Sequence, residues 1–442
     1  MAKNERQEEE TTQFVDSGNN LKRLSLYDPP VAVLGIFLII LSVILCFIYL
    51  DYSEALGAVY RVPNWLQFPN DMGRRLDFLK EEGNGCDVFD GEWVWDEDYP
   101  LYLSKDCTFI EQSFNCIQNG RPDVRFTKWR WQPRECDLPR FDGKLLLEKL
   151  RNKRVVFAGD SLGRNQWESM LCLLASAVAE KDSVYEVNGS LIRKQRQGTL
   201  VFKFQGYNCT LEFYWSPYLV HLDQPSSGAP TSNKKVRSTL KLDLLDPISR
   251  KWRDADVLVL NSGHWWTSHM FEQLFSLTHR GLHFQVGQEV KMNMSMEEAY
   301  RKSMETVMQW IKNEVNTNKT QIFFRTYEPR HFLFGEWNTG GRCNEEKLPE
   351  LGAAPVLSLP LWTHIQFELA ANKILPNRTY DLLNITEMSA RRKDGHMSVY
   401  YLASHRAPMK RQDCSHWCLP GVPDSWNELL YAFFLKHQAT RL

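Results

Sequence analysis

The sequence has 442 residues, and its 53 Lys and Arg against 54 Asp and Glu give a formal net charge of −1. This balance argues against a nucleic-acid-binding protein, which would carry a basic face, and a hydrophobic share of 43% argues against wholesale disorder. The length would hold two or three average domains with a large buried core. Its 15 tryptophans and 10 cysteines are the unusual features, because aromatic rings in grooves are common where sugars bind.

An uncharged stretch of twenty residues, 31–50, predicts a transmembrane anchor. Ser42 is its only polar interruption, and at helical rise it would cross a hydrocarbon core of roughly 30 Å. No face of this stretch is polar, which argues against a buried core helix. A cleaved signal peptide is the alternative, because small residues follow, but the stretch is long for a signal and acidic residues precede it.

The flanking charges predict the orientation of this anchor. Lys22 and Arg23 lie just before it, whereas Arg61 is the only basic residue in the twenty positions that follow. An excess of basic residues marks the cytosolic side. We therefore expect a disordered cytosolic tail over residues 1–30, a type II anchor, and a lumenal stem over residues 51–85.

The glycosylation motifs and the cysteines agree with a lumenal location of the rest. Nine of the ten cysteines follow the anchor, and an oxidising lumen would pair them, leaving at least one thiol over. Six Asn-x-Ser/Thr motifs also follow it: Asn188, Asn208, Asn293, Asn318, Asn377 and Asn384.

Residues 86–142 predict a loop-rich module held by disulfides, because they have little regular periodicity. The residues that set this stretch apart are Cys86, Cys107, Cys116, Cys136, Trp93, Trp95, Trp129 and Trp131.

From residue 143 to 442 the pattern predicts an α/β domain. Short apolar runs typical of buried strands lie at 154–158, 256–260 and 321–325, and amphipathic helical patterns at 167–178 and 296–315, with further helices expected at 361–369 and 424–437. Strands separated by helices indicate a parallel sheet covered on both faces. Two β-rich segments, 199–204 and 210–215, predict an inserted hairpin.

The first predicted strand is followed by Gly159-Asp160-Ser161. Functional groups collect where the strands of such sheets end. A sharp turn here would present the Ser161 hydroxyl, and the following helix N-terminus favours developing negative charge. An equally good interpretation is that Ser161 is only a helix N-cap.

A nucleophilic serine needs a base and a group that orients the base. Asp413 and His416 lie three residues apart near the C-terminus, so that in a turn the carboxylate can reach the imidazole. Two other interpretations remain open: a zinc site formed with Cys414 and Cys418, disfavoured because no second ligand pair completes it, and a loop stapled by its cysteines. We predict no metal site.

The end of the second predicted strand carries Asn261, whose amide could donate to an oxyanion, although a turn-forming role is the simpler interpretation. His264, Trp265 and Trp266 follow. Two adjacent tryptophans beside a site suggest a platform for a sugar ring; the alternative is that both belong to the core.

Several motifs, in this order along the chain, resemble one family. They are Cys86-Asp87, Gly91-Glu92-Trp93-Val94, Trp129-Arg130-Trp131, Cys136-Asp137-Leu138-Pro139-Arg140-Phe141, Gly159-Asp160-Ser161-Leu162 with Arg164-Asn165-Gln166, Tyr214-Trp215-Ser216-Pro217, Asp394-Gly395-His396, and Asp413 with His416. From about Cys86 to the C-terminus the chain resembles the plant trichome birefringence-like family of polysaccharide O-acetyltransferases. Met397 departs from the family pattern, where proline is usual.

The resemblance implies a GDSL/SGNH-like α/β/α fold and a Ser161, His416 and Asp413 triad, with Asp160 and Arg164 near the oxyanion. It also implies four disulfides: Cys86–Cys136, Cys107–Cys172, Cys116–Cys418 and Cys343–Cys414. Cys209 would then be the spare thiol. The third pair would tie the tryptophan-rich module to the segment that carries His416.

The expected function is a Golgi-type polysaccharide O-acetyltransferase that works through an acetyl-serine. The implied partners are a cell-wall polysaccharide, with pectin or xylan slightly favoured, the membrane, and a membrane protein as one source of acetyl. No tightly bound cofactor is expected; the acetyl donor, acetyl-CoA or a relayed acetyl group, is a co-substrate. The alternatives are an esterase that hydrolyses acetylated polysaccharide and a non-catalytic polysaccharide-binding protein.

Overall fold

A computed structural model describes residues 75–190, 192, 198–223, 238–267, 283–291, 294–352, 355, 359–370, 380–402 and 411–440, with five positions of the predicted anchor, 38, 41–43 and 45. Those five positions are helical. The other residues up to 74, and with them the predicted tail, most of the anchor and most of the stem, lie outside the described residues. Within the described ranges, no helix is both long enough and apolar enough to cross a membrane.

A seven-stranded sheet is the centre of the unit that begins at Arg74. Its strands, in spatial order, are β15 (Asp381–Leu383), β14 (Gln321–Arg325), β11 (Val257–Asn261), β5 (Arg154–Gly159), β8 (Cys209–Trp215), β7 (Thr199–Phe204) and β6 (Val184–Glu186). The first five are parallel, whereas β7 and β6 are antiparallel to their neighbours. The sheet is therefore mixed. The predicted hairpin exists as β7 and β8, but it extends the sheet beside β5 instead of standing apart as an insertion.

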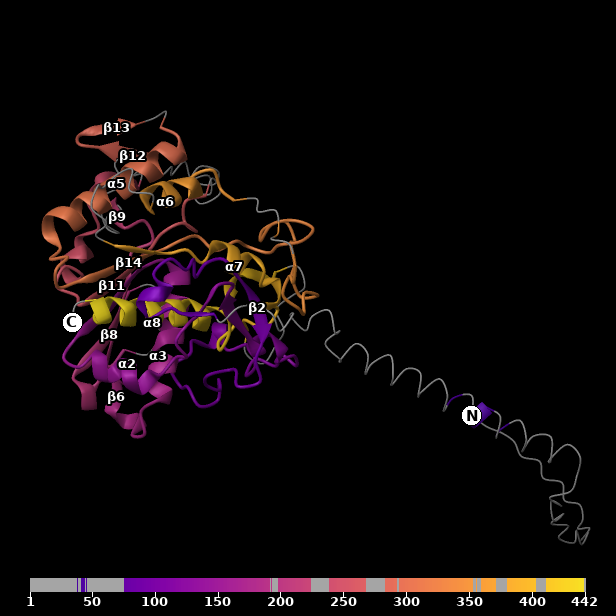
Figure 1. Ribbon diagram of the computed structural model, residues 1–442. Helices are drawn as coiled ribbons and strands as arrows, with labels where there is room; N and C mark the ends of the chain where they lie inside the picture. Colours follow the sequence, from indigo (N-terminus) through magenta and orange to yellow (C-terminus); the bar gives the residue numbers. More distant parts are fainter. Residues whose placement is uncertain are drawn as a thin grey trace, which may run out of the picture. The chain divides into compact units, whose positions relative to one another are not determined.

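Helices cover both faces of this sheet (Figure 1). One face carries α2 (Gly143–Lys149), α3 (Ser161–Ser176) and α8 (Val422–Thr440); the other carries α5 (Met296–Glu314) and α6 (Thr363–Ala370). The alternation of side chains along β5 explains the two cores, because Val155 and Phe157 pack with α3 whereas Val156 and Ala158 pack with α5. The predicted three-layer α/β/α arrangement is thus found in the described residues.

A second, smaller sheet was not predicted. It consists of β13 (Glu289–Lys291), β12 (His283–Val286), β10 (Thr239–Leu245) and β9 (Val220–Asp223) in that order, and Thr306 of α5 donates a hydrogen bond from its hydroxyl to the Leu242 carbonyl. Three of its strands have only three or four residues, which is too short for a periodicity to stand out in the sequence.

The tryptophan-rich module is built from short strands and turns of 3-10 helix. Its elements are β2 (Gly91–Trp95), β3 (Trp129–Pro133), β4 (Cys136–Asp137), η3 (Gln112–Phe114) and η4 (Arg125–Lys128). The end of the predicted stem adds β1 (Leu76–Asp77), which pairs with β4, and η2 (Glu81–Gly83). Trp93 and Trp131 face each other across β2 and β3 and are almost wholly buried, at 3% and 4% exposure. These two rings belong to the core and cannot line a sugar groove; Trp95 is exposed.

The described residues contain the four disulfides that the resemblance implied, and two of them, Cys107–Cys172 and Cys116–Cys418, join the module to the rest. The other two are Cys86–Cys136, within the module, and Cys343–Cys414, outside it. Cys209 is the free cysteine of the described residues, and burial in β8 raises the pKa of its thiol to about 12. The remaining elements are α7 (Thr386–Ala390), β16 (His396–Ser398), β17 (Asp413–Trp417), η5 (Lys181–Ser183), η7 (Gln205–Tyr207), η8 (Pro247–Lys251) and η9 (Lys393–Gly395).

Candidate active site

Ser161 is the first residue of α3, directly after β5. The N-cap is Asp160, whose carboxylate accepts the backbone N–H groups of Leu162 (3.0 Å) and Gly163 (3.4 Å). The interpretation of Ser161 as the cap is therefore wrong. Of the three N–H groups that open the helix, the one on Ser161 is left without an acceptor among the described residues, so it can donate to a bound oxyanion.

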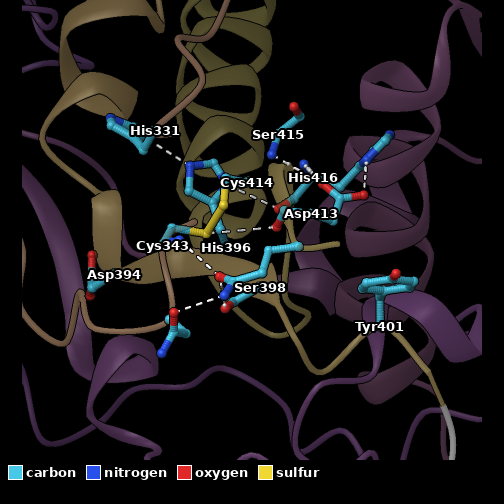
Figure 2. Close-up of a disulfide and its surroundings, with 12 residues drawn as sticks. His331, Cys343, Asp394, His396, Ser398, Tyr401, Asp413, Cys414, Ser415 and His416 are labelled. Atoms are coloured by element: carbon cyan, nitrogen blue, oxygen red, sulfur yellow. Dashed lines mark hydrogen bonds and ion pairs between the residues drawn. A yellow bond between two sulfur atoms is a disulfide. The ribbon is translucent and has the colours of Figure 1, made fainter. Parts of the chain in front are cut away.

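The imidazole of His416 lies between Ser161 and Asp413. Its Nε2 is 2.7 Å from the Ser161 hydroxyl oxygen, and its Nδ1 is 2.8 Å from Oδ2 of Asp413. Both Asp413 and His416 come from β17, which pairs with β16, as Figure 2 shows around the neighbouring disulfide. The sequence places the two groups three residues apart, and the structure brings Ser161 to them from a position 255 residues away.

The charges at this site favour protonation of the His416 imidazole. Burial opposes a charge on Asp413, but the His416 imidazole and the N–H groups of His416 and Ser415 outweigh it and lower the pKa of the carboxyl. Burial also opposes the imidazolium form of His416, but the Asp413 carboxylate outweighs it and raises the pKa of His416 above its ordinary 6.5. Asp413 therefore stays ionised and stabilises His416 when it takes a proton.

Asn165 connects α3, which begins at Ser161, to β17, which carries His416. Its side chain accepts the Trp417 N–H (2.8 Å) and donates to the Trp417 carbonyl (3.2 Å). The first turn of α3 thus holds Trp417, the residue after His416, at a fixed position relative to Ser161. In the sequence, Asn165 belongs to a family motif without an assigned role, and its position one turn after Ser161 is the signal for this contact.

Asn261, at the end of β11, lies against the turn that presents Ser161. Its amide nitrogen donates to Oδ1 of Asp160 at 2.7 Å, which leaves its second N–H for another acceptor. Gly159 and Gly163 allow this approach, because a Cβ on either one would lie 1.9 Å from the Asn261 amide oxygen. Asn261 is thus a candidate oxyanion donor, and Asp160 is an acceptor that orients it.

Arg164 does not lie at the oxyanion position that we expected. Its side chain is 2% exposed and pairs with Glu111 (3.0 Å) and Glu168 (2.9 Å), and it also donates to the carbonyl of Ile192 (2.9 Å). Burial raises the pKa of Glu168 to about 7 against the pull of Arg164. Arg164 therefore joins α3 to the module through a buried ion-pair cluster, and we correct its expected role.

The His264-Trp265-Trp266 segment divides between the site and the core. Trp266 is 1% exposed and donates its indole N–H to the Ser262 hydroxyl, so the prediction that it stacks on a sugar is wrong. Trp265 is partly exposed and meets Trp215 edge to face at 5.4 Å. His264 is close to Glu328, with its Nε2 at 3.1 Å from the Glu328 carbonyl and 3.4 Å from its carboxylate.

Glu328, which we had not singled out, is a buried carboxyl three residues beyond the end of β14. It pairs with Arg325 at 2.5 Å, and burial raises its pKa to about 7. Oε1 of Glu328 and Oδ2 of Asp160 are buried and have no hydrogen-bond donor among the described residues. Acidic and amide groups therefore gather at the carboxyl edge of β5, β11 and β14, which is where sequence reasoning placed the site.

The zinc alternative is contradicted by the disulfides, whereas the loop stapled by its cysteines is compatible with them. Cys414 and Cys418 are both in disulfides and cannot bind zinc. In the part of the chain that the structure describes, no three or more His, Cys, Asp or Glu side chains are gathered as metal ligands.

The module reaches the catalytic strand directly. The Cys116–Cys418 disulfide lies two residues beyond His416, the Phe114 ring is 5.8 Å from the His416 ring, and the Leu419 N–H donates to the Phe114 carbonyl. The module therefore helps to fix His416, as the implied third disulfide suggested.

Most of the chain matches two known family models. Residues 138–433 match the model of the PC-Esterase family, described as a GDSL/SGNH-like acyl-esterase family found in Pmr5 and Cas1p, and residues 84–137 match the PMR5 N-terminal domain. Protein trichome berefringence-like 7 of Arabidopsis thaliana is 40% identical over 95% of this chain and 87% of its own length. The chain belongs to the trichome birefringence-like family.

Two further members from Arabidopsis thaliana are covered less completely. Protein trichome birefringence is 42% identical over 82% of this chain and 58% of its own length, and protein trichome birefringence-like 1 is 41% identical over 83% and 65%. The chain thus spans less than two thirds of these two trichome birefringence-family relatives. Its own residues 138–433 form an acyl-esterase domain of the GDSL/SGNH-like type.

Proposed function

We propose that this protein is a polysaccharide O-acetyltransferase that works through an acetyl-serine on Ser161. The observation that carries the proposal is the continuous hydrogen-bonded chain from Ser161 through His416 to Asp413. Its three members have the roles of nucleophile, general base and orienting carboxylate in serine acyl transfer. An intact chain of this kind argues against a polysaccharide-binding protein that has lost its activity.

In the first step, His416 Nε2 takes the proton of the Ser161 hydroxyl while Oγ attacks the carbonyl carbon of the acetyl donor. The oxyanion accepts hydrogen bonds from the Ser161 N–H and the second amide N–H of Asn261. The imidazolium then gives its proton to the leaving group. Loss of one oxyanion donor generally costs about a hundredfold or more in kcat.

In the second step, a sugar hydroxyl attacks the acetyl-serine, and His416 again removes the proton. Transfer exceeds hydrolysis only where the acceptor is held in line and water is scarce. A groove of about 1,110 Å³ is lined by amide side chains of the module, among them Gln112, Asn115 and Asn119, and we propose that it binds the polysaccharide acceptor. None of its lining residues is Ser161, His416 or Asp413, but Phe114, which lies between the lining residues Gln112 and Asn115, has its ring 5.8 Å from the His416 ring.

Hydrolysis of acetylated polysaccharide is the second candidate, favoured by the family's description as acyl-esterases. It uses the same acetyl-serine, with water in place of the sugar hydroxyl. The two reactions differ only in the product.

We further propose that residues 31–50 anchor the enzyme in the Golgi membrane with the domain in the lumen, where it acts on a cell-wall polysaccharide, first of all pectin or xylan. The four disulfides support an oxidising compartment. The exposure of Asn188, Asn208 and Asn318 supports glycosylation there; Asn384 is partly buried, and Asn293 and Asn377 lie outside the described residues.

The test incubates the full chain with an acetyl donor and a panel of pectin and xylan oligosaccharides. We expect acetylated oligosaccharide by mass spectrometry, a transient acetyl group on Ser161, and neither with Ser161→Ala. Acetate without acetylated sugar would establish the esterase instead. An acetyl-enzyme that persists in the Ser161→Ala protein would overturn the nucleophile assignment.

Ser415→Ala is the matched control. This serine is adjacent to His416, and its side chain points away from the catalytic pair in Figure 2, so its loss should leave both products unchanged. Acetyl-CoA and a membrane extract that supplies acetyl groups, used as separate donors, identify the donor class.

A further inference from the structure

Two histidines outside the triad, His331 and His396, lie side by side next to β17 (Figure 2). Their rings are 4.9 Å apart between centroids, and Nδ1 of His331 is 2.6 Å from Nε2 of His396. His396 is 2% exposed. The mechanism described above uses neither residue.

The outer nitrogen of each ring faces a main-chain carbonyl. Nε2 of His331 is 2.8 Å from the carbonyl oxygen of Ala390, and Nδ1 of His396 is 3.0 Å from the carbonyl oxygen of His416, the catalytic histidine. A carbonyl oxygen can only accept a hydrogen bond. Both outer nitrogens must therefore carry a proton.

The contact between Nδ1 of His331 and Nε2 of His396, the two inner nitrogens, then requires a third proton. A neutral imidazole has one N–H, and in each ring the outer nitrogen has used it. Two neutral rings would bring two lone pairs within 2.6 Å of each other, where they repel. One proton between the inner nitrogens satisfies all three contacts and gives the pair one positive charge.

We propose that His331 and His396 bind one shared proton, and that this cationic pair is a positioning device that fixes the His416 carbonyl and, with it, the catalytic imidazole. The proton comes from solvent and binds a ring lone pair, and no other bond changes. The proposal rests on the role of His416 as general base given above.

Some surroundings of the pair favour its positive charge, and others oppose it. The Trp417 ring stacks on His396 at 4.0 Å between centroids, which favours a cation. The charged and titratable groups that face the pair are Asp394, Asp413, Lys393, Arg121 and His416. Burial lowers the pKa of both imidazoles. The pair therefore holds its proton only while all three contacts are made, so the proton and the position of the His416 carbonyl depend on each other.

The same pair holds the strand at a second point. The backbone N–H of His331 donates to the carbonyl of Cys414 at 3.0 Å, and Cys414 is tied to Cys343 by a disulfide. His331 thus contacts β17 at Cys414, directly after Asp413, and His396 contacts it at His416. These two contacts lie on either side of Ser415 and hold the part of β17 that joins Asp413 to His416.

The proton count can be measured without any activity assay. In full-length protein with 15N-labelled histidine, long-range 1H–15N NMR spectra distinguish protonated from bare ring nitrogens. At neutral pH we expect three N–H groups on the four nitrogens of His331 and His396. Only two would overturn the proposal.

The same spectra on the Ser161→Ala protein separate this proposal from the proposed function. We expect three N–H groups there as well. Full activity of Ser161→Ala would overturn the nucleophile but leave the count unchanged.

Two substitutions of one residue test the positioning role. His331→Leu removes the inner donor and should lower kcat by up to about a hundredfold with little change in KM. His331→Asn places an amide N–H near the former Nδ1, where it can donate to His396 without a charge, and should recover most of that loss. A folded Leu variant with wild-type kcat, or an Asn variant no better than Leu, would overturn the positioning role.

If His331→Leu does not fold, His396→Asn replaces it. Its amide can still donate to the His416 carbonyl but cannot hold the shared proton, so we expect a smaller loss of kcat than in His396→Leu, which has no donor at that carbonyl. A folded His396→Leu protein with wild-type kcat would overturn the positioning role.

Discussion

Replacement of Asp413 by Asn should inactivate the enzyme by changing the proton arrangement of His416 and not the shape of the site. Oδ1 of Asp413 accepts the N–H groups of Ser415 and His416, at 3.0 and 2.9 Å. These two donors require an oxygen, so the amide oxygen of the variant must take this place. The amide NH2 then faces Nδ1 of His416, which is 2.8 Å away from Oδ2 in the native protein.

An NH2 group at that position needs an acceptor, so Nδ1 must give up its proton and Nε2 must carry one. A protonated Nε2 cannot take the proton of Ser161. Loss of the orienting carboxylate in this way costs about 10⁴-fold in kcat, or about 5.5 kcal/mol in activation free energy. We expect KM for the acetyl donor to stay nearly unchanged, because the carboxylate contacts only His416 and its backbone neighbours.

The assay is steady-state turnover of a chromogenic acetyl ester, with thermal unfolding measured in parallel. Asp424→Asn is the control, because it makes the same chemical change at a buried carboxyl that is bonded to Ser169 and Tyr102 and lies away from the triad. The control should lower Tm but not kcat. An Asp413→Asn enzyme that loses less than about tenfold in kcat would refute the tautomer argument.

Four further results are expected. The raised pKa of His416 means that kcat/KM should rise with pH through a midpoint above 6.5, because only the neutral imidazole can accept a proton. Asn165→Ala leaves a buried Trp417 N–H without an acceptor and should lower the unfolding free energy by about 1–3 kcal/mol, with a fall in kcat. Serine in place of both Cys116 and Cys418 opens a loop of 302 residues and should cost up to about 5 kcal/mol in denaturant unfolding. Trp266→Ala should cost about 3–5 kcal/mol in stability, with no specific rise in KM for the acceptor.

Each of these has an outcome that contradicts it. A midpoint at or below 6.5 would mean that Asp413 does not govern the His416 pKa. Wild-type stability of Asn165→Ala would show that the hydrogen bonds from Asn165 to Trp417 do not stabilise the fold. An unchanged unfolding curve for the double serine variant would show that the Cys116–Cys418 disulfide does not stabilise it either. If Trp266→Ala kept its stability and raised only KM for oligosaccharide, the ring would be a sugar platform after all.

The parts of the fold that the sequence predicted are those with local signals. The runs at 154–158, 256–260 and 321–325 became β5, β11 and β14, because continuous apolar strands are typical of the middle of a parallel sheet. The apolar stripe at 296–315 became α5 with a Ser295 capping box. The small second sheet and the pairing of β8 with β5 depend on contacts between distant segments, which periodicity does not encode.

The candidate site also combines local features, which the sequence predicted, with contacts between distant residues, which it did not predict. The spacing of Asp413 and His416 predicted their contact, since both lie in one turn. Arg164 could not be placed, because its partner Glu111 lies 53 positions earlier and only folding brings them together in the core. The neighbours Trp265 and Trp266 look equivalent in sequence, but Trp265 is partly exposed and Trp266 is buried in the core.

The Cys116–Cys418 disulfide has a consequence for biosynthesis. Its two cysteines are separated by 302 residues, so at about 5–20 residues per second Cys116 is made some 15–60 s before its partner. During that time other thiols of the module are within its reach, Cys107 and Cys136 among them, and a thiolate exchanges readily with a neighbouring disulfide. Correct pairing therefore depends on a late rearrangement or on protection of Cys116. The yield of folded protein should respond to a disulfide isomerase more strongly than the yield of a variant without Cys116 and Cys418.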